Sequence, residues 1–233
     1  MSFTDDLGAE VVKILKEKWE IRDGQRVPET PDLKLANDGL KLTGAVLYAD
    51  LAESTQLVTR HSATFVAEIY KCYLNCACRI IRNQGGEITA FDGDRVMAVF
   101  LGTTRCTNAV RAALAINHAV TKIINPKMRE QYPTLPADFQ IRQAVGVDTS
   151  DLLVARTGIR GSNDLVWVGR AANLAAKLCA LRQGNYASWI TSDVYDLCAE
   201  SVKTANSTSM WEKRSWTQQG NMSVYCSSYH WPL

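Results

Sequence analysis

A pair of apolar segments separated by a tight turn most constrains the fold of this chain. Residues 87–91 and 95–101 both read as short strands, and Asp92-Gly93 stands between them. An Asp-Gly pair between two such segments favours a two-residue β-hairpin connection. The pattern therefore predicts two adjacent antiparallel strands, with Asp94 at the start of the second.

The order of the other segments predicts an α+β protein. Apolar spacing and Gly or Pro punctuation set the boundaries. Strands are expected at 43–50, 139–147, 152–157, 187–191, 209–216 and 222–228, and helices at 54–82, 103–124, 170–181 and briefly from Ser192. A helix capped by Thr4 and ending before Asp23-Gly24 precedes them, followed by a linker. The β-α-β-β-α-β order with extensions predicts a ferredoxin-like split-βαβ sandwich, with helices packed on a mostly antiparallel sheet.

Composition restricts the class of protein. The 233 residues are 46% hydrophobic and 21% charged, which suffices for a substantial core. A net charge of +2 without a polybasic run argues against nucleic acid or a membrane as the main partner. The cysteines number seven, with no signal peptide and no spanning apolar run, so we expect a reduced, cytoplasmic protein. Cys72, Cys76 and Cys78 lie in an apolar helical stretch without nearby histidines, which favours core packing over zinc binding.

Two aspartates suggest the chemistry. Asp50 ends the strand 43–50 and Asp94 begins the second strand of the hairpin. If these strands are neighbours, both carboxylates reach one sheet edge, where they can hold Mg²⁺ or Mn²⁺ against a nucleoside triphosphate. Taken singly, a strand-end cap or a turn residue explains each equally well. Asp92 is the rival to Asp94 and is assigned to the turn.

Three segments resemble a known enzyme family. Tyr48-Ala-Asp-Leu-Ala-Glu-Ser-Thr55, Gly85-Gly-Glu-Ile followed by Gly93-Asp94-Arg-Val-Met-Ala98, and Val168-Gly-Arg-Ala-Ala-Asn-Leu-Ala-Ala-Lys-Leu178 are similar to the signature segments of class III nucleotidyl cyclase catalytic domains. They occur in the family's order. The resemblance implies a catalytic domain over residues 41–233, preceded by the N-terminal helix and linker, residues 1–40.

The resemblance also implies the site. In the family, two divalent metals bind residues that correspond to Asp50, Asp94 and the backbone carbonyl of Leu51. The backbone N–H groups of residues 51–55, which include Ser54 and Thr55, can face triphosphate oxygens at a helix start. The metals would activate the ribose 3′-hydroxyl for attack on the α-phosphorus and neutralise the pyrophosphate leaving group.

Two residues four apart on the helix 170–181 share one face and match further family positions. Asn173 corresponds to the residue that orients the ribose. Lys177 stands where the family has an arginine that stabilises charge on the phosphates; the charge remains, but the planar fork is lost. Arg170, Arg156 and Arg160 are the arginines considered for compensation.

The base-reading positions depart most from purine cyclases. Ala90 and Val166 stand where those enzymes have polar side chains, so the usual adenine or guanine contacts are missing. Phe91 and Trp167 beside them suit a pocket for a single-ring base. The combination resembles the pyrimidine cyclases of bacterial Pycsar antiphage systems, which implies 3′,5′-cyclic UMP or CMP, with UTP slightly favoured over CTP, for a separate effector.

Other features bear on substrate and assembly. Tyr48 shares a strand face with Asp50 and is a candidate nucleotide contact, although a core role is equally plausible. Arg95 is expected to point away from the triphosphate. In the family the metal ligands and the Asn/Arg helix come from different subunits, so the resemblance implies a twofold homodimer with sites at its interface. The alternatives are an adenylate or guanylate cyclase, an inactive cyclase-like nucleotide-binding module and, less favoured, a diguanylate cyclase.

Overall fold

A computed structural model describes residues 2–232, and the chain divides into two compact units. The larger unit comprises Gly44–Ser150 and the chain from Arg170 onward; the smaller comprises the chain up to Thr43 together with Asp151–Gly169. Two long strands, β2 (Asp38–Leu51) and β5 (Gln143–Ile159), contribute residues to both units. The larger unit holds both aspartates singled out from the sequence.

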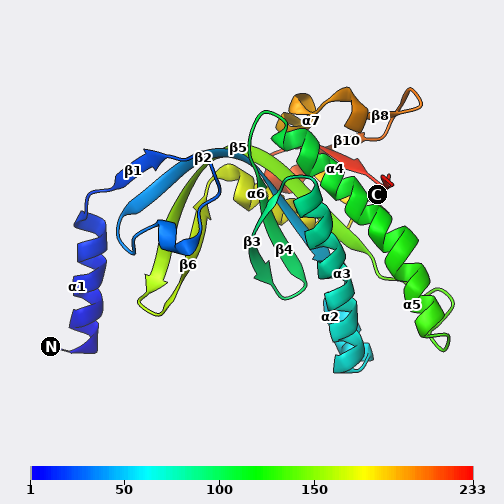
Figure 1. Cartoon of the computed structure of the whole chain (residues 1–233), viewed down its shortest axis with the longest axis horizontal. Coiled ribbons are helices and arrows are strands. Elements are labelled where there is room, and N and C mark those ends of the chain that lie inside the picture. Colours follow the sequence, from blue (N-terminus) through cyan, green and yellow to red (C-terminus); the bar gives the residue numbers. More distant parts are fainter. Residues whose placement is uncertain (1, 233) are drawn as a thin grey trace. The chain divides into compact units, whose positions relative to one another are not determined.

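The larger unit is built on one mixed, mainly antiparallel sheet (Figure 1). Its strand order is β10-β11-β7-β5-β2-β4-β3. The strands not yet given are β3 (Glu87–Asp92), β4 (Arg95–Phe100), β7 (Ser188–Thr191), β10 (Glu212–Trp216) and β11 (Met222–Ser227). The predicted hairpin is confirmed as β3 and β4, and β4 pairs antiparallel with β2. The two aspartates therefore end and precede neighbouring strands.

Helices cover one face of this sheet. The layer consists of α2 (Ser54–Arg60), α3 (Ala63–Asn83), α4 (Arg105–His118), a π-helical segment (Ala119–Ile124) and α5 (Asn125–Gln131). Every second residue of β2 packs in one hydrophobic core with α3 and α4. These strand residues are Ala45, Leu47, Ala49 and Leu51. Because strand side chains alternate, Tyr48 and Asp50 face the opposite side. The α+β architecture follows the expectation, with α6 (Arg170–Cys179) added on that opposite face.

Gly146 of β5 explains how closely α6 approaches the sheet. A Cβ atom at this position would lie 2.2 Å from the carbonyl oxygen of Ala175 and 2.5 Å from the nitrogen of Cys179. Its neighbours Val145 and Val147 belong to the core on the helix-layer side. The helix and strand backbones thus touch where only glycine fits.

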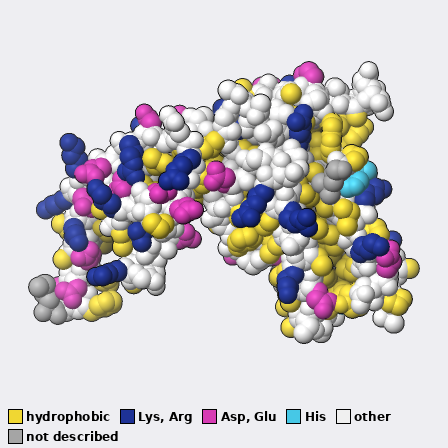
Figure 2. Space-filling model, in the orientation of Figure 1, with side chains coloured by type: hydrophobic (Ala, Val, Ile, Leu, Met, Phe, Trp, Pro, Cys, Tyr) yellow, Lys and Arg dark blue, Asp and Glu magenta, His cyan; other side chains and the backbone are white. Residues whose placement is uncertain are grey.

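A groove remains open in the helix layer. Figure 2 shows hydrophobic side chains gathered at the surface between α3 and α5, where a groove of about 500 Å³ lies. Its lining includes Phe65, Ile69, Cys76, Ile123 and Met128. It lies on the face of the sheet away from Asp50.

The smaller unit combines helix α1 (Phe3–Lys16), β1 (Glu20–Asp23), β6 (Ser162–Val168), the first residues of β2 and the last of β5. β1 pairs parallel with β2, and β5 and β6 form an antiparallel hairpin. All residues of α1 are exposed, apolar ones included. Ser2 caps this helix through a capping box, so the expected cap at Thr4 is wrong, and the helix ends at Lys16, well before Asp23.

Several boundaries differ from those expected. The helix expected over 54–82 is two helices, because Ser62 breaks it and caps α3 with its side chain. Pro126 lies in the first turn of α5, where its missing N–H costs nothing, so helical structure continues beyond residue 124, the expected end of the helix. The strands expected at 139–147 and 152–157 form one strand, β5, and its partner β6 was not anticipated.

Two other expectations concern membranes and cysteines. Among residues 2–232, none of the helices combines the length and apolarity needed to cross a bilayer. All seven cysteines carry free thiols, and no cluster of three or more His, Cys, Asp or Glu in this range could hold a metal. Cys76 and Cys78 are half-buried and pack against the core, whereas Cys72 is exposed, so the core-packing interpretation is wrong for Cys72.

Candidate active site

Asp50 and Asp94 meet at the edge formed by β2 and β4. Asp50 points to the face opposite the helix layer, with its side chain 21% exposed. Asp94 lies in the turn directly before β4, and its Oδ2 atom is buried. The antiparallel register pairs Ala49 of β2 with Val96 of β4, so Asp50 and Asp94 lie at the same edge of the sheet. The Asp94 carboxylate also contributes to the raised pKa of Asp50. The role of the two carboxylates as metal ligands stays a prediction.

The electrostatics of this pair suit a divalent cation. Burial raises the pKa of Asp50, Asp94 raises it further, and Arg182 lowers it. Asp94 Oδ2 accepts no hydrogen bond from any residue between 2 and 232. A buried carboxylate oxygen without a donor is costly unless a cation or water completes it. Two carboxylates and the Leu51 carbonyl make a hard-oxygen set that fits Mg²⁺ or Mn²⁺.

Arg182 is the basic residue that the sequence reasoning missed. Its Nη2 atom lies 3.0 Å from Oδ2 of Asp50 and 3.3 Å from the carbonyl oxygen of Leu51. Its Nη1 atom donates to the carbonyls of Cys179 and Leu181, just beyond α6. Basic side chains near the C-terminus of a helix often bond its last carbonyl groups. The position of Arg182 just after the predicted helix 170–181 was therefore a sequence signal that could have identified it.

Tyr48 and Arg95 lie on the same face as Asp50. The register pairs Tyr48 with Met97, and Met97 with Ala90, so these three side chains form a row across β2, β4 and β3. The Arg95 guanidinium carbon lies 5.5 Å from the centre of the Tyr48 ring. The expectation that Arg95 points away is therefore wrong, because Asp94 belongs to the turn and the alternation begins one residue later.

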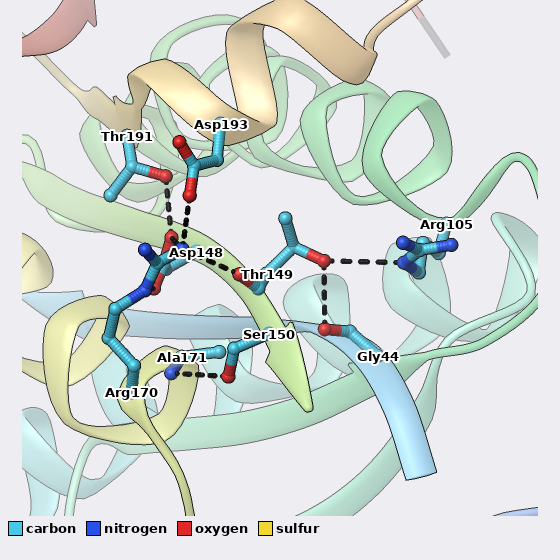
Figure 3. Close-up of polar contacts among 9 residues, drawn as sticks. All are labelled: Gly44, Arg105, Asp148, Thr149, Ser150, Arg170, Ala171, Thr191 and Asp193. Carbon is cyan, nitrogen blue, oxygen red and sulfur yellow. Dashed lines mark hydrogen bonds and ion pairs between the residues drawn. The ribbon is translucent and has the colours of Figure 1, made fainter. Parts of the chain in front are cut away.

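A buried polar cluster fixes the start of α6 (Figure 3). Arg170 donates to the buried Asp148 with an Nε–Oδ2 distance of 3.1 Å, to the carbonyl of Thr149 and to Asp193. The Oγ atom of Ser150 accepts from the backbone N–H of Ala171 at 3.0 Å. Burial raises the pKa of Asp148, while hydrogen bonds from Thr191, Thr149 and Arg170 lower it. These contacts orient the helix that carries Asn173 and Lys177.

Asn173 and Lys177 lie on the exposed face of α6, as their spacing predicted. The opposite face of the helix is buried against the sheet. Arg170, considered for compensating the lost arginine at 177, is engaged in holding the helix start. Arg156 is bonded to Asn163 and to the Leu33 carbonyl in the smaller unit. Compensation by Arg170 or Arg156 would break these contacts.

The start of α2 brings further groups to the Asp50 edge. Ser54 begins this helix and Thr55 follows it, after Glu53 in a left-handed conformation with φ 60°. Burial raises the pKa of Tyr70, Asp94 and Asp50 raise it further, and a hydrogen bond with Ser54 lowers it. Tyr70 is thus close to Ser54 and to the two carboxylates. Tyr70 was not predicted as a site residue, because a tyrosine on an amphipathic helix is typical of a core position.

The predicted base-pocket residues fall in both units. Ala90 is half-buried on β3, in the row with Tyr48. Phe91 pairs with Val96 in the next row and is 59% exposed. Val166 and Trp167 lie on β6 of the smaller unit, with Trp167 buried. The roles of these residues in base binding stay predictions.

Cys179, the last residue of α6, is buried beside the Asp50 edge. Burial raises the pKa of its thiol to about 12, Asp50 adds to this, and Arg95 and Arg182 oppose it. A thiol with such a pKa stays protonated near neutral pH and is a poor nucleophile. The residues here therefore suit metal-assisted chemistry rather than a cysteine intermediate.

The raised pKa of Asp50 predicts a pH effect on the metal-free protein. Folded Asp50 keeps its proton above the usual value of 3.8, so the folded state binds more protons than the unfolded state in that interval. Stability should fall as pH rises through the interval. We expect Asp50→Asn, in EDTA near pH 7, to raise the melting temperature above wild type, as measured by circular dichroism.

The same melting experiment contains its control. Asp92→Asn alters an exposed aspartate that pairs with Arg95, so it should not reproduce the rise. A lower melting temperature for Asp50→Asn than for wild type would contradict the assigned environment of Asp50.

Comparison with known proteins places the chain among cyclases. It is 46% identical over 234 residues to a uridylate cyclase of Xanthomonas perforans, with all of both chains covered. It is also 46% identical over 235 residues to a uridylate cyclase of Burkholderia cepacia, again over the whole of both. No protein-family model matches the chain.

Solved structures share the fold. The adenylyl cyclase CyaB from P. aeruginosa matches with a TM-score of 0.66 at 21% identity, over 81% of this chain and 95% of that one. The guanylyl cyclase Cya2 matches with a TM-score of 0.68 at 17% identity, over 82% of this chain and 94% of that one. At these identities the likeness establishes the architecture, and it agrees with the α+β sandwich expected from the sequence.

Proposed function

This chain belongs to the uridylate cyclase family and has the class III nucleotidyl cyclase fold, and from that premise we propose that it converts UTP to 3′,5′-cyclic UMP and pyrophosphate. The observation that carries the proposal is the convergence of Asp50 and Asp94, with a buried, unpartnered oxygen on Asp94. If Asp94 served only in a structural ion pair, its Oδ2 atom would have a partner within the chain. An oxygen without a partner among residues 2–232 is available to a cation that also binds the substrate phosphates.

The reaction divides among residues of this chain. Asp50, Asp94 and the Leu51 carbonyl would hold Mn²⁺ or Mg²⁺, which when bound supplies the charge that activates the ribose hydroxyl and neutralises the phosphates. Ser54 and Thr55 lie at a helix start directly after the metal edge, where their backbone N–H groups can meet phosphate oxygens. Asn173 would orient the ribose, and Lys177 would stabilise negative charge on the phosphates.

The direction of α6 supports a homodimer. Asn173 and Lys177 project away from the sheet on which their helix packs, while Asp50 lies on the sheet edge. Each chain therefore offers two half-sites, one of carboxylates and one of amide and ammonium groups. A twofold dimer would join each half to its complement and make two equivalent sites.

Base selection is assigned to Ala90 and to Tyr48 and Met97, which lie beside it on the neighbouring strands. A methyl group there cannot bond a purine edge, whereas the half-buried Tyr48 nearby keeps a hydroxyl facing the same side. Burial raises the pKa of Tyr48 and Arg95 lowers it, so the hydroxyl remains a donor near neutral pH. We infer a pyrimidine substrate, with UTP preferred over CTP in line with the names of the relatives.

The biological setting is part of the same proposal. The resemblance to Pycsar pyrimidine cyclases suggests a cyclic nucleotide messenger that a separate effector protein reads during bacterial antiphage defence. Production in the cytoplasm would give that effector direct access to the messenger. The catalytic domain over residues 41–233 is proposed on the same basis.

The substrate proposal is tested by incubating the purified chain with Mn²⁺ and, separately, with UTP, CTP, GTP and ATP. We expect cyclic UMP as the main product, identified by mass and retention against standards. Dominant cyclic CMP would overturn the preference for uracil, and dominant cyclic AMP or GMP would overturn the base argument at Ala90. Absence of any cyclic product across divalent metals would favour the inactive nucleotide-binding module.

A further inference from the structure

Arg182 contacts two of the three groups that would hold the metal, the Asp50 carboxylate and the Leu51 carbonyl. The same Nη2 atom lies 3.0 Å from Oδ2 of Asp50 and 3.3 Å from the Leu51 carbonyl. A divalent cation bound by these oxygens would meet the guanidinium at contact distance. Two positive charges at such a separation repel strongly in a half-buried site. We propose that Arg182 and the catalytic cation compete for Asp50 and Leu51, so that metal binding displaces Arg182.

The contact is built rather than incidental. Besides Asp50 and Leu51, the guanidinium donates to the carbonyls of Cys179 and Leu181, so both of its terminal nitrogens are engaged. Its side chain is 35% exposed, against 21% for that of Asp50. Charge-assisted bonds of this kind are stronger than neutral ones. Arg182 thereby ties the end of α6 to the end of β2.

The structure also provides space for the displaced side chain. A cavity of about 320 Å³ is lined by Arg182 itself together with polar residues, among them Gln140, Gln143 and Asn185. Their amide oxygens can accept hydrogen bonds from a guanidinium. The displaced guanidinium would therefore have polar partners beside its present position.

The competition would couple metal loading to α6. The helix carries Asn173 and Lys177. Arg182 holds its C-terminal end to Asp50 and Leu51 at the end of β2. When the cation takes Asp50, the carbonyls of Cys179 and Leu181 lose that tie. The segment from Ala180 to Ala187 then becomes freer. Arg182 acts here as a positioning residue that reports whether the carboxylate half-site is loaded. This inference rests on the metal assignment of the proposed function.

Mn²⁺ binding in the absence of nucleotide tests the competition directly. Titration of the full chain followed by electron paramagnetic resonance gives a dissociation constant without any catalytic readout. We expect Arg182→Ala to bind Mn²⁺ about three- to tenfold more tightly than wild type, since partly exposed ion pairs contribute on the order of 1 kcal/mol. Arg182→Lys, which keeps the charge but cannot span both oxygens, should fall between the two.

Two further variants make the result specific. Arg214→Ala removes an arginine that is 48% exposed and paired with Glu212, and it should leave the Mn²⁺ affinity unchanged. In an Asp50→Asn background, Arg182→Ala should give a smaller gain than in wild type, because one of the two contested ligands is gone, and a gain of full size there would count against the proposal. An unchanged or weaker affinity for Arg182→Ala would overturn the proposal.

A second measurement reads the coupling to α6. We expect hydrogen exchange in residues 180–187 of wild type to increase when Mn²⁺ is added, and to be high already in Arg182→Ala. Exchange that Mn²⁺ leaves unchanged or slows in wild type would contradict displacement. These results are independent of turnover: a chain that yields no cyclic nucleotide would refute the proposed function, whereas the metal titration would still decide the competition.

Discussion

Replacing Asp50 or Asp94 with alanine is expected to lower cyclic UMP formation at least about a thousandfold, which corresponds to roughly 4 kcal/mol of lost transition-state stabilisation. Each carboxylate would supply a ligand that no neighbouring side chain duplicates, since the remaining partner at this edge is a backbone carbonyl. The measurement is the initial rate with UTP and saturating Mn²⁺, with folding verified by circular dichroism.

Asp92→Ala is the matched control for that loss. Asp92 lies two residues before Asp94 in the same hairpin, but its side chain is 76% exposed and pairs with Arg95. We expect its rate to stay within about threefold of wild type, in keeping with the small contribution of exposed ion pairs. Full activity in Asp94→Ala together with loss in Asp92→Ala would reverse the assignment of the metal ligand.

The second large effect is recovery of activity by mixing two inactive variants. Asp50→Ala removes the carboxylate half-site, and the double variant Asn173→Ala, Lys177→Ala removes the α6 half-site. If each active site joins halves from two chains, a mixed dimer has one intact site. Because a purified mixed dimer has one intact site of two, we expect about half of the wild-type rate.

Mixing Asp50→Ala with Asp94→Ala provides the control, because both changes damage the same half-site and no pairing restores it. Subunits should be co-expressed with distinct tags, so that mixed dimers are purified before the assay. No recovery in the first mixture would show that one chain supplies all the groups of its own site. Recovery in this control would show instead that Asp50 and Asp94 do not belong to the same half-site.

Local chemistry explains which parts of the fold could be predicted. Asp92-Gly93 fixed the hairpin because few other geometries accept that dipeptide between two strands. The spacing of Asn173 and Lys177 fixed their common face. Within the helix layer, Ser62 and Pro126 were misread, because each acts through a backbone position at a helix start that apolar periodicity does not reveal.

The site was predictable only in part. A carboxylate after a strand is visible in a sequence, and its neighbour across the sheet follows once the strand order is correct. Arg182 lies 132 positions from Asp50 along the chain, so their ion pair depends on how α6 settles on the sheet. The orientation of Arg95 depended on whether Asp94 belonged to the turn or the strand, a shift of one residue that reverses every later side chain.

The missing side chain at Gly146 determines how closely α6 packs on the sheet. Because no side chain separates strand from helix there, the height at which Asn173 and Lys177 stand above the sheet is fixed by direct contact between two main chains. A methyl group added at Gly146 would push α6 away from the sheet and move the side chains of Asn173 and Lys177 outward with it. The missing Cβ atom of Gly146 thus sets how far the two polar side chains extend from the sheet.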